Sequence, residues 1–223
     1  MKKAVLVILF LGILMNHGFS QFISNFGLNV GANYSGQLWF PQNPQVKIPA
    51  TGYKFGYLIF LSTEKNINKI FSIRPEIGYI QKGFKNLVEL HFPDGSLGNT
   101  RNKNVIFHNM ALNLGFKVSP FKVKFSPYAI LGIHIDYMFA YKDILVEESG
   151  SGQAYNMYKT QIDDFNKLNL GLMSIIGLQY NGQIYLEFEY NQSLTDKYKS
   201  STLRISDECW SLKLGLNINK IIK

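Results

Sequence analysis

The strongest constraint on the fold of this chain is a two-residue alternation that recurs along most of its length. Between residues 209 and 219, for example, one tryptophan, three leucines and one isoleucine alternate with serine, lysine, glycine and asparagine. This period places successive side chains on opposite faces of a β-strand. Helical periodicity is scarce after residue 20. The pattern therefore predicts an all-β fold.

The alternation is carried by eight segments, at residues 26–34, 53–62, 71–82, 106–118, 128–141, 168–180, 183–191 and 209–219. One face of nearly every segment is apolar over about ten residues, the length that a tilted strand needs to cross a bilayer. The other face carries glycine, asparagine and charge, which cannot form the core of a soluble barrel because unpaired buried charge is costly. We therefore expect a closed, antiparallel, up-and-down transmembrane β-barrel of about eight strands.

The connections between these segments alternate between long and short. The long ones are residues 36–52, 84–105, 142–167 and 194–208, and the short ones are 63–70, 119–124 and the pair Asn181-Gly182. This rhythm is typical of outer-membrane barrels, which have long external loops and short periplasmic turns. A two-residue loop at Asn181-Gly182 would put the faces of the two flanking segments in conflict, whereas a three-residue loop or a bulge would not. The face assignment of residues 168–180 therefore stays open.

The first twenty residues have the pattern of a secretory signal peptide. Lys2 and Lys3 precede an apolar run at residues 4–15, and Gly18 and Ser20 supply small residues before a cut at Gln21. The run is short for a membrane anchor, which is the alternative interpretation. We expect residues 1–20 to be cleaved, residues 21–223 to form one barrel domain, and both ends of the mature chain to face the periplasm of a Gram-negative cell.

The composition and charge of the chain limit the classes of molecule that it is expected to bind. Hydrophobic residues make up 46% of the chain, charged residues 17% and aromatic residues 14%, which suits strands and the aromatic girdles of membrane barrels. The net charge of +8 is dispersed, without the basic runs of nucleic-acid-binding proteins. It favours anionic surfaces such as lipid headgroups, or is solvated loop charge. The single cysteine, Cys209, excludes an intramolecular disulfide, and its distance from the cleavage region argues against a lipoprotein.

Charged residues of both signs lie on the polar face of the predicted strands and are expected to fill the lumen. They are Arg74, Lys82, Lys117 and Lys213, balanced by Glu76, Asp136, Glu187 and Glu189. If Ser193 pairs near Cys209, Glu189 lies opposite Lys213, and we predict that these two form a structural ion pair that plugs the barrel. His134 and Asp136 could orient a general base, but a lumen hydrogen-bond network is the favoured interpretation.

Other candidates for chemistry lie outside the lumen, and each has a simpler interpretation. His91, Asp94 and Ser96 share one turn-forming segment, so their pattern favours a turn over catalysis. Glu147-Glu148 and Asp163-Asp164 could form a cation site, or they are solvated loop charge. Tyr155, Met157 and Tyr158 could contact a partner protein. His108 is expected at the membrane interface. No HExxH, GxSxG, P-loop or dinucleotide-binding motif occurs. We therefore expect no catalytic, cofactor-binding or metal-binding residues.

Several segments resemble the PorT-like outer-membrane β-barrel domain family of Gram-negative bacteria. Residues 73–83 (IRPEIGYIQKG) resemble a family strand that ends in a Tyr-x-Gln-Lys-Gly-like signature, and residues 55–56, 127–132 and 189–195 resemble other family segments. Glu189 stands near a usual arginine and Ser193 replaces a usual glycine, while the chain ends without an aromatic residue. The resemblance implies an outer-membrane barrel, and some members look like parts of secretion machinery.

The expected function is that of a structural or interaction module in the outer membrane, accessory to secretion or envelope assembly. An eight-stranded barrel is nearly filled by its own side chains, so a general porin is not expected. Its partners would be outer-membrane lipid and envelope or secretion proteins, with no nucleic acid. Two alternatives stay open: an outer-membrane enzyme that modifies lipid or peptide, and a secreted soluble lipid-binding barrel.

Overall fold

The computed structural model describes residues 25–44, 50–87, 99–100, 103–121, 123–147 and 154–221. The predicted signal peptide at residues 1–20 lies outside this range, as do His91, Asp94, Ser96 and Glu148 and the side chains of Glu147 and Tyr155. The predictions made for these residues therefore stay predictions.

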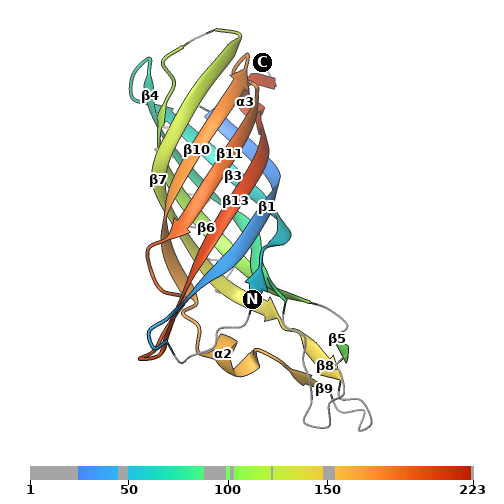
Figure 1. The fold of residues 1–223 in the computed structure, drawn as a ribbon. Helices are drawn as coiled ribbons and strands as arrows, with labels where there is room; N and C mark the ends of the chain where they lie inside the picture. Colours follow the sequence, from blue (N-terminus) through green and yellow to red (C-terminus); the bar gives the residue numbers. More distant parts are fainter. Residues whose placement is uncertain are drawn as a thin grey trace, which may run out of the picture.

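Eight long strands form a closed antiparallel barrel (Figure 1). They are β1 (Asn25–Pro41), β3 (Lys54–Asn66), β4 (Phe71–Asn86), β6 (Asn104–Val118), β7 (Phe125–Lys142), β10 (Leu168–Tyr180), β11 (Ile184–Ser193) and β13 (Leu203–Asn217). Each pairs with its neighbour along the chain, and β1 pairs with β13 to close the barrel. The eight segments predicted from the alternation coincide with these strands, so the predicted fold is confirmed.

Shorter elements surround the barrel. β2 (Thr51–Gly52) pairs with β4 and β12 (Tyr198–Lys199) with β13, while β5 (Asn99–Thr100), β8 (Leu145–Glu147) and β9 (Ala154–Asn156) form a separate small sheet. This sheet and α2 (Lys159–Asp163) lie at the long-loop end, and α3 (Ile218–Ile221) lies at the short-turn end (Figure 1). In the described part of the chain, neither helix has the length and apolarity that a membrane crossing requires.

The long-loop ends of two strands extend further than the sequence predicted. β1 continues to Pro41, and β13 begins at Leu203 rather than at Cys209. These extensions pair with each other, with Trp39 opposite Ile205 and Pro41 opposite Leu203. Residues 205–209 are all buried, so the alternation that marks a half-exposed strand is lost there. The pattern therefore placed the start of this strand too late.

The hairpin at Asn181-Gly182 has a three-residue loop. Tyr180 pairs with Ile184, and the Gln183 amide donates to the Tyr180 carbonyl at 2.9 Å. Asn181 and Gly182 have φ values of 50° and 67°, a left-handed backbone that asparagine and glycine tolerate best. This loop removes the conflict between the flanking strands. In β10 the even-numbered residues from Leu168 face outward, and the odd-numbered ones face the lumen.

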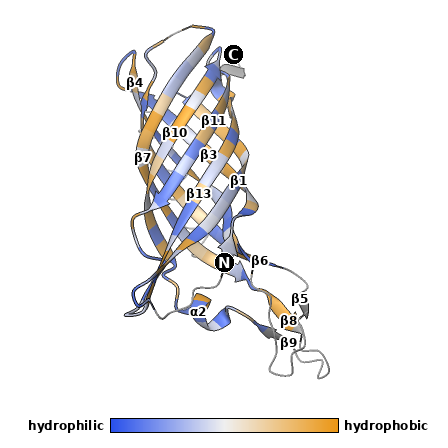
Figure 2. Ribbon diagram, in the orientation of Figure 1, coloured by the Kyte–Doolittle hydropathy of each residue, from blue (hydrophilic) through white to orange (hydrophobic). Residues whose placement is uncertain are grey.

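Apolar and polar residues alternate along the strands (Figure 2), and their burial shows that the two faces separate as predicted. Leu214 is 50% exposed on the outside of the barrel, whereas its neighbour Lys213 is 0% exposed in the lumen. Lumen glycines make room for large polar side chains. A Cβ atom on Gly215 would lie 1.9 Å from the ring of Tyr185, and one on Gly177 would lie 2.3 Å from the ring of Tyr128. Glycine at these positions therefore allows each tyrosine ring to lie over the neighbouring strand, since Tyr185 is paired with Gly215 and Tyr128 with Gly177.

An apolar cluster closes the long-loop end of the barrel. We call it the loop cap, and its buried members are Phe84, Val105, Phe107, Met138, Ile144, Val146, Tyr158, Ile162, Phe165 and Ile205. They come from the ends of the long strands, from β8 and from the segment around α2. The sequence pattern did not predict this cluster. The loop cap forms a hydrophobic core next to the polar lumen, at the long-loop end of the barrel.

Candidate functional site

The centre of the lumen holds five buried charges, which we call the central ionic layer: Arg74, Glu76, Glu187, Glu189 and Lys213. Arg74 contacts Glu76 at 2.6 Å and makes two hydrogen bonds to Glu187. Lys213 Nζ contacts Glu76 Oε2 at 3.2 Å, Glu187 Oε2 at 3.3 Å and Glu189 Oε2. The layer is one network of three carboxylates and two cations, contributed by β4, β11 and β13.

Neutral side chains complete this network. Asn29 and Asn113 each donate to a different oxygen of Glu76 at 2.9 Å, and the Tyr128 hydroxyl donates to Glu187 Oε1 at 2.5 Å. The hydroxyl of Tyr185 in turn donates to Asn29. Buried carboxylates need such partners because desolvation otherwise exceeds the gain from ion pairing. The sequence placed Asn29 and Tyr128 on the polar face but did not identify them as network members.

The predicted register of β11 against β13 is wrong by two residues. Glu187, not Glu189, lies directly opposite Lys213, and Glu189 lies opposite Ser211. The prediction assumed that Ser193 pairs near Cys209. In the structure β13 begins at Leu203, and Cys209 is paired with Asn191. Lys213 is long enough to contact both glutamates. The structure therefore brings Glu189 and Lys213 together through a diagonal contact.

A second group of polar side chains lies between the central ionic layer and the loop cap. Lys82 Nζ donates to Asp136 Oδ2 at 2.7 Å and lies 3.0 Å from His134 Nε2. His134 Nδ1 lies 2.6 Å from Asn113 Oδ1, and Asn169 donates to Asp136 at 3.1 Å. His134 Nε2 also lies 3.0 Å from Asp136 Oδ2, so this nitrogen contacts both members of the Lys82–Asp136 pair. Both nitrogens of His134 are thus occupied by lumen partners.

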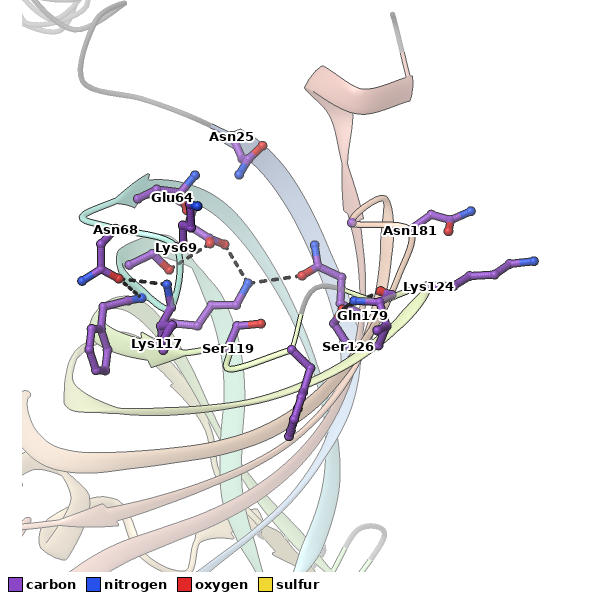
Figure 3. Close-up of a pocket in the computed structure, with 17 residues that line it drawn as sticks. Asn25, Glu64, Asn68, Lys69, Lys117, Ser119, Lys124, Ser126, Gln179 and Asn181 are labelled. Carbon is purple, nitrogen blue, oxygen red and sulfur yellow. Dashed lines mark hydrogen bonds and ion pairs between the residues drawn. The ribbon is translucent and has the colours of Figure 1, made fainter.

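Lys117, the remaining predicted network member, lies at the short-turn end. Its Nζ contacts Glu64 Oε2 at 2.9 Å, while Ser72 donates to Glu64 Oε1 at 2.9 Å. Gln179 Oε1 lies 3.5 Å from the same ammonium (Figure 3). The sequence missed Glu64 because its predicted strand ended at residue 62. These side chains line a polar cavity of about 490 Å³ that the short turns surround (Figure 3).

The loop cap also contains polar groups with defined partners. Asp143 accepts the amides of Ile144 at 2.7 Å and Tyr158 at 2.9 Å, and the Tyr158 hydroxyl donates to Asn86 at 3.1 Å. Burial, together with the charge of Asp143, raises the pKa of Tyr158 to about 12. Tyr158 is 5% exposed, so its predicted role in contacting a partner is wrong. Instead, it is a structural residue of the cap.

The other sequence candidates lie apart from the lumen. His108 is half-buried on the outer face, where Nδ1 lies 2.6 Å from the Tyr79 hydroxyl, and its ring contacts Phe139. Asp163 accepts the Tyr141 hydroxyl at 2.8 Å. Within the described ranges, no three histidine, cysteine or acidic residues gather as they would around a metal ion.

Comparison with models of known protein families supports the architecture. The family model of the outer membrane protein beta-barrel domain matches residues 19–199. No curated protein matches the sequence. Among solved structures, Ail, the attachment invasion locus protein of Yersinia pestis, is 14% identical with a TM-score of 0.41, and the match covers 86% of this chain and 97% of Ail.

Two further solved structures match at similar levels. Neisserial surface protein A is 14% identical with a TM-score of 0.44, covering 87% of this chain and 98% of that one. The outer membrane enzyme PagL is 12% identical with a TM-score of 0.43, covering 85% of this chain and 99% of that one. Since the family model matches most of the sequence, this chain belongs to the outer membrane protein beta-barrel domain family.

Proposed function

We propose that the chain is an outer-membrane interaction module whose barrel is sealed and whose long-loop end binds an envelope protein. The observation that carries this proposal is the double closure of the lumen. The central ionic layer fills the middle of the barrel, and the loop cap covers one end. A barrel closed in both ways offers no continuous path for solutes, so its recognition surfaces are on the outside.

The outer surface of the loop cap supports an interaction role. The segment around α2 buries Tyr158, Ile162 and Phe165 in the cap while Lys159, Gln161 and Asp164 stay exposed. This arrangement holds an exposed polar surface on an ordered apolar base, which lowers the entropic cost of binding a protein. We further propose that this interaction serves a PorT-like role accessory to secretion or envelope assembly. We also propose that residues 1–20 direct export and are then cleaved.

Catalysis is not part of the proposal, since the candidate residues are poorly placed for it. His134 and Asp136 are buried in the lumen beside Lys82. The exposed-face pair of Tyr79 and His108 has no serine or carboxylate partner within the described residues. A soluble lipid-binding barrel is also disfavoured, because leucine, isoleucine and phenylalanine side chains are exposed around the whole barrel.

The proposal is tested by site-specific photo-crosslinking of the full chain in intact outer membranes. A crosslinker at Gln161 reports on the long-loop end, and one at Lys69, an exposed residue of a short turn, is the matched control. We expect a discrete protein adduct from Gln161 that is absent from Lys69. An adduct at Lys69 alone, or at neither site, would contradict the proposal.

A further inference from the structure

A polar cavity of about 490 Å³ opens at the short-turn end of the barrel, outside the part of the lumen that the central ionic layer fills (Figure 3). This volume lies within the range of about 300–1,000 Å³ that is typical of small-molecule sites. The polar side chains that line the cavity include Asn25, Glu64, Ser72, Lys117, Ser119 and Gln179. They come from strands on several sides of the barrel, so the cavity has the size and the enclosure of a ligand site.

The innermost side of the cavity is an ion pair whose charges are already compensated. Lys117 is 3% exposed, and its Nζ lies 2.9 Å from Glu64 Oε2 and 4.3 Å from the centre of the Tyr128 ring. Ser72 donates to the other carboxylate oxygen of Glu64 at 2.9 Å. A charged ligand would lose its hydration here without meeting an uncompensated partner. The ion pair therefore favours a neutral ligand.

Three side chains beside this ion pair have hydrogen-bonding groups that no described residue uses. The Asn25 amide and the Ser119 hydroxyl make no hydrogen bond within the described set, and Gln179 uses only its carbonyl oxygen, 3.5 Å from Lys117 Nζ. Figure 3 shows Lys117 and Gln179 directed toward one another, with Asn25 and Ser119 on either side of them. An amide both donates and accepts, as does a hydroxyl. The walls therefore suit a ligand that carries donors and acceptors in alternation.

The rim of the cavity combines exposed cations with an aromatic ring. Lys124 is directed away from the cavity in Figure 3, with its ammonium 5.3 Å from the centre of the Tyr180 ring, and Lys69 is exposed in a turn. Exposed cations contribute little to affinity because solvent screens them. Phe121 also lines the cavity and is 57% exposed. Its ring offers an apolar face at the entrance, on which C–H groups can pack.

We propose that this cavity binds a neutral saccharide built of N-acetylated amino sugars. Sugar hydroxyls match the mixed donors and acceptors of Asn25, Ser119 and Gln179, and an acetamido group pairs with a side-chain amide. The C–H face of a sugar ring packs on Phe121. The site lies at the opposite end from the proposed protein contact and does not depend on it. Because the short-turn end is expected to face the periplasm, the cell-wall glycan and a soluble saccharide are the two sources of this chemistry.

The test is a titration of the detergent-solubilised full chain, read by saturation-transfer NMR of the ligand, in a detergent without a sugar headgroup. The probes are tetra-N-acetylchitotetraose, which is neutral, and tetragalacturonate, which is acidic. We expect the neutral probe to bind about tenfold more tightly, since the acidic probe finds no uncompensated buried cation. Gln179→Met and Ser119→Ala should each weaken binding of the neutral probe about fivefold, the size of one hydrogen bond.

Two exposed residues at the long-loop end provide matched controls. Gln161→Met and Ser201→Ala make the same chemical changes away from the cavity and should bind like the wild type. A heat-dependent mobility shift in gels confirms that each variant is folded. Tighter binding of the acidic probe, no binding of the neutral probe, or equal effects of Gln179→Met and Gln161→Met would overturn the proposal.

Sedimentation with purified cell-wall sacculi distinguishes the two sources of the saccharide. Sedimentation of the wild type that is reduced in Gln179→Met, but not in Gln161→Met, would support the proposal and assign the cavity to the cell-wall glycan. Binding of the neutral probe without sedimentation would support it and assign the cavity to a soluble saccharide.

Discussion

The central ionic layer and the loop cap both fill the interior with buried side chains, but by opposite physical means. The layer uses five buried charges, and each charge depends on named partners from other strands. The cap uses ordinary apolar packing of side chains from strand ends and loops. An ionic layer tolerates no loss of a partner, because an uncompensated buried charge is left behind, whereas an apolar core loses stability in proportion to the volume removed. The two closures should therefore respond differently to substitution.

The largest expected effect is on the ionic layer. Lys213→Met leaves three carboxylates with Arg74 alone, and we expect it to lower the free energy of unfolding by about 3–5 kcal/mol. Urea unfolding in detergent measures this value. Lys159→Met, an exposed cation at the long-loop end, is the control and should change the free energy of unfolding by less than about 0.5 kcal/mol. Similar values for the two variants would remove the contrast between buried and exposed charge.

A second expectation separates the lumen from the membrane-facing side of the same strand. Leu214→Arg places a charge on the lipid-facing side of β13 and should cost about 2–4 kcal/mol near the bilayer midplane. Asn217→Arg, on the lumen face close to the short-turn end, should cost less. Folding yields into lipid vesicles provide the measurement. Equal yields from the two variants would contradict the assignment of the faces.

The third expectation concerns coupling inside the ionic layer. A double-mutant cycle of Glu189→Gln with Lys213→Met should show a coupling energy of about 0.5–3 kcal/mol in the same unfolding assay. The parallel cycle of Glu187→Gln with Lys213→Met tests the residue that lies directly opposite Lys213. Additive effects in the first cycle would reject Glu189 and Lys213 as a structural pair. Additivity in both cycles would reject the ionic layer as a network.

Substitution in the loop cap should be milder. Ile144→Val removes one methylene from a fully buried side chain and should cost about 0.5–1.5 kcal/mol. Limited proteolysis within residues 142–167 follows this loss locally, and urea unfolding of the barrel follows it globally. A loss as large as that of Lys213→Met would show that the cap and the ionic layer do not differ in tolerance.

A similarly small effect at neutral pH is expected from Tyr158→Phe, which removes one hydrogen bond and should cost about 1 kcal/mol. The pKa of Tyr158 is raised to about 12 in the folded chain, so the neutral form is the one that folding favours. The contribution is complete below the unfolded pKa of about 10 and is lost as the pH rises through 12. The difference between the ultraviolet titrations of wild type and variant measures this ionisation. Ionisation near pH 10 would contradict burial of the hydroxyl.

The sequence predicts which residues face the lumen in the ionic layer, but it does not predict how they pair across strands. Alternation alone placed Lys213 inside and Leu214 outside, because the two-residue period assigns every residue to a face. The partner of Lys213 could not be read in the same way. Pairing depends on the register between strands, and the late predicted start of β13 shifted that register by two residues, from Glu187 to Glu189.

The loop cap had no comparable signal in the sequence. Residues 205–209 are buried throughout, and Tyr158 and Ile162 belong to a loop whose apolar residues have no regular period. Their burial results from contacts between segments far apart in the chain, such as the hydrogen bond between Tyr158 and Asn86. Local patterns do not encode contacts of this kind, so the sequence alone predicts an exposed Tyr158.

The most direct test of the closed lumen is a planar-bilayer recording of the full, unmodified chain. With the central ionic layer and the loop cap both in place, the account predicts no steady conductance above that of the bare membrane. A heat-dependent mobility shift in gels should confirm that the protein is folded before it is inserted into the bilayer. A lack of conductance then reflects a closed lumen and not a missing barrel. A steady, ohmic conductance from the folded wild-type barrel would contradict the account.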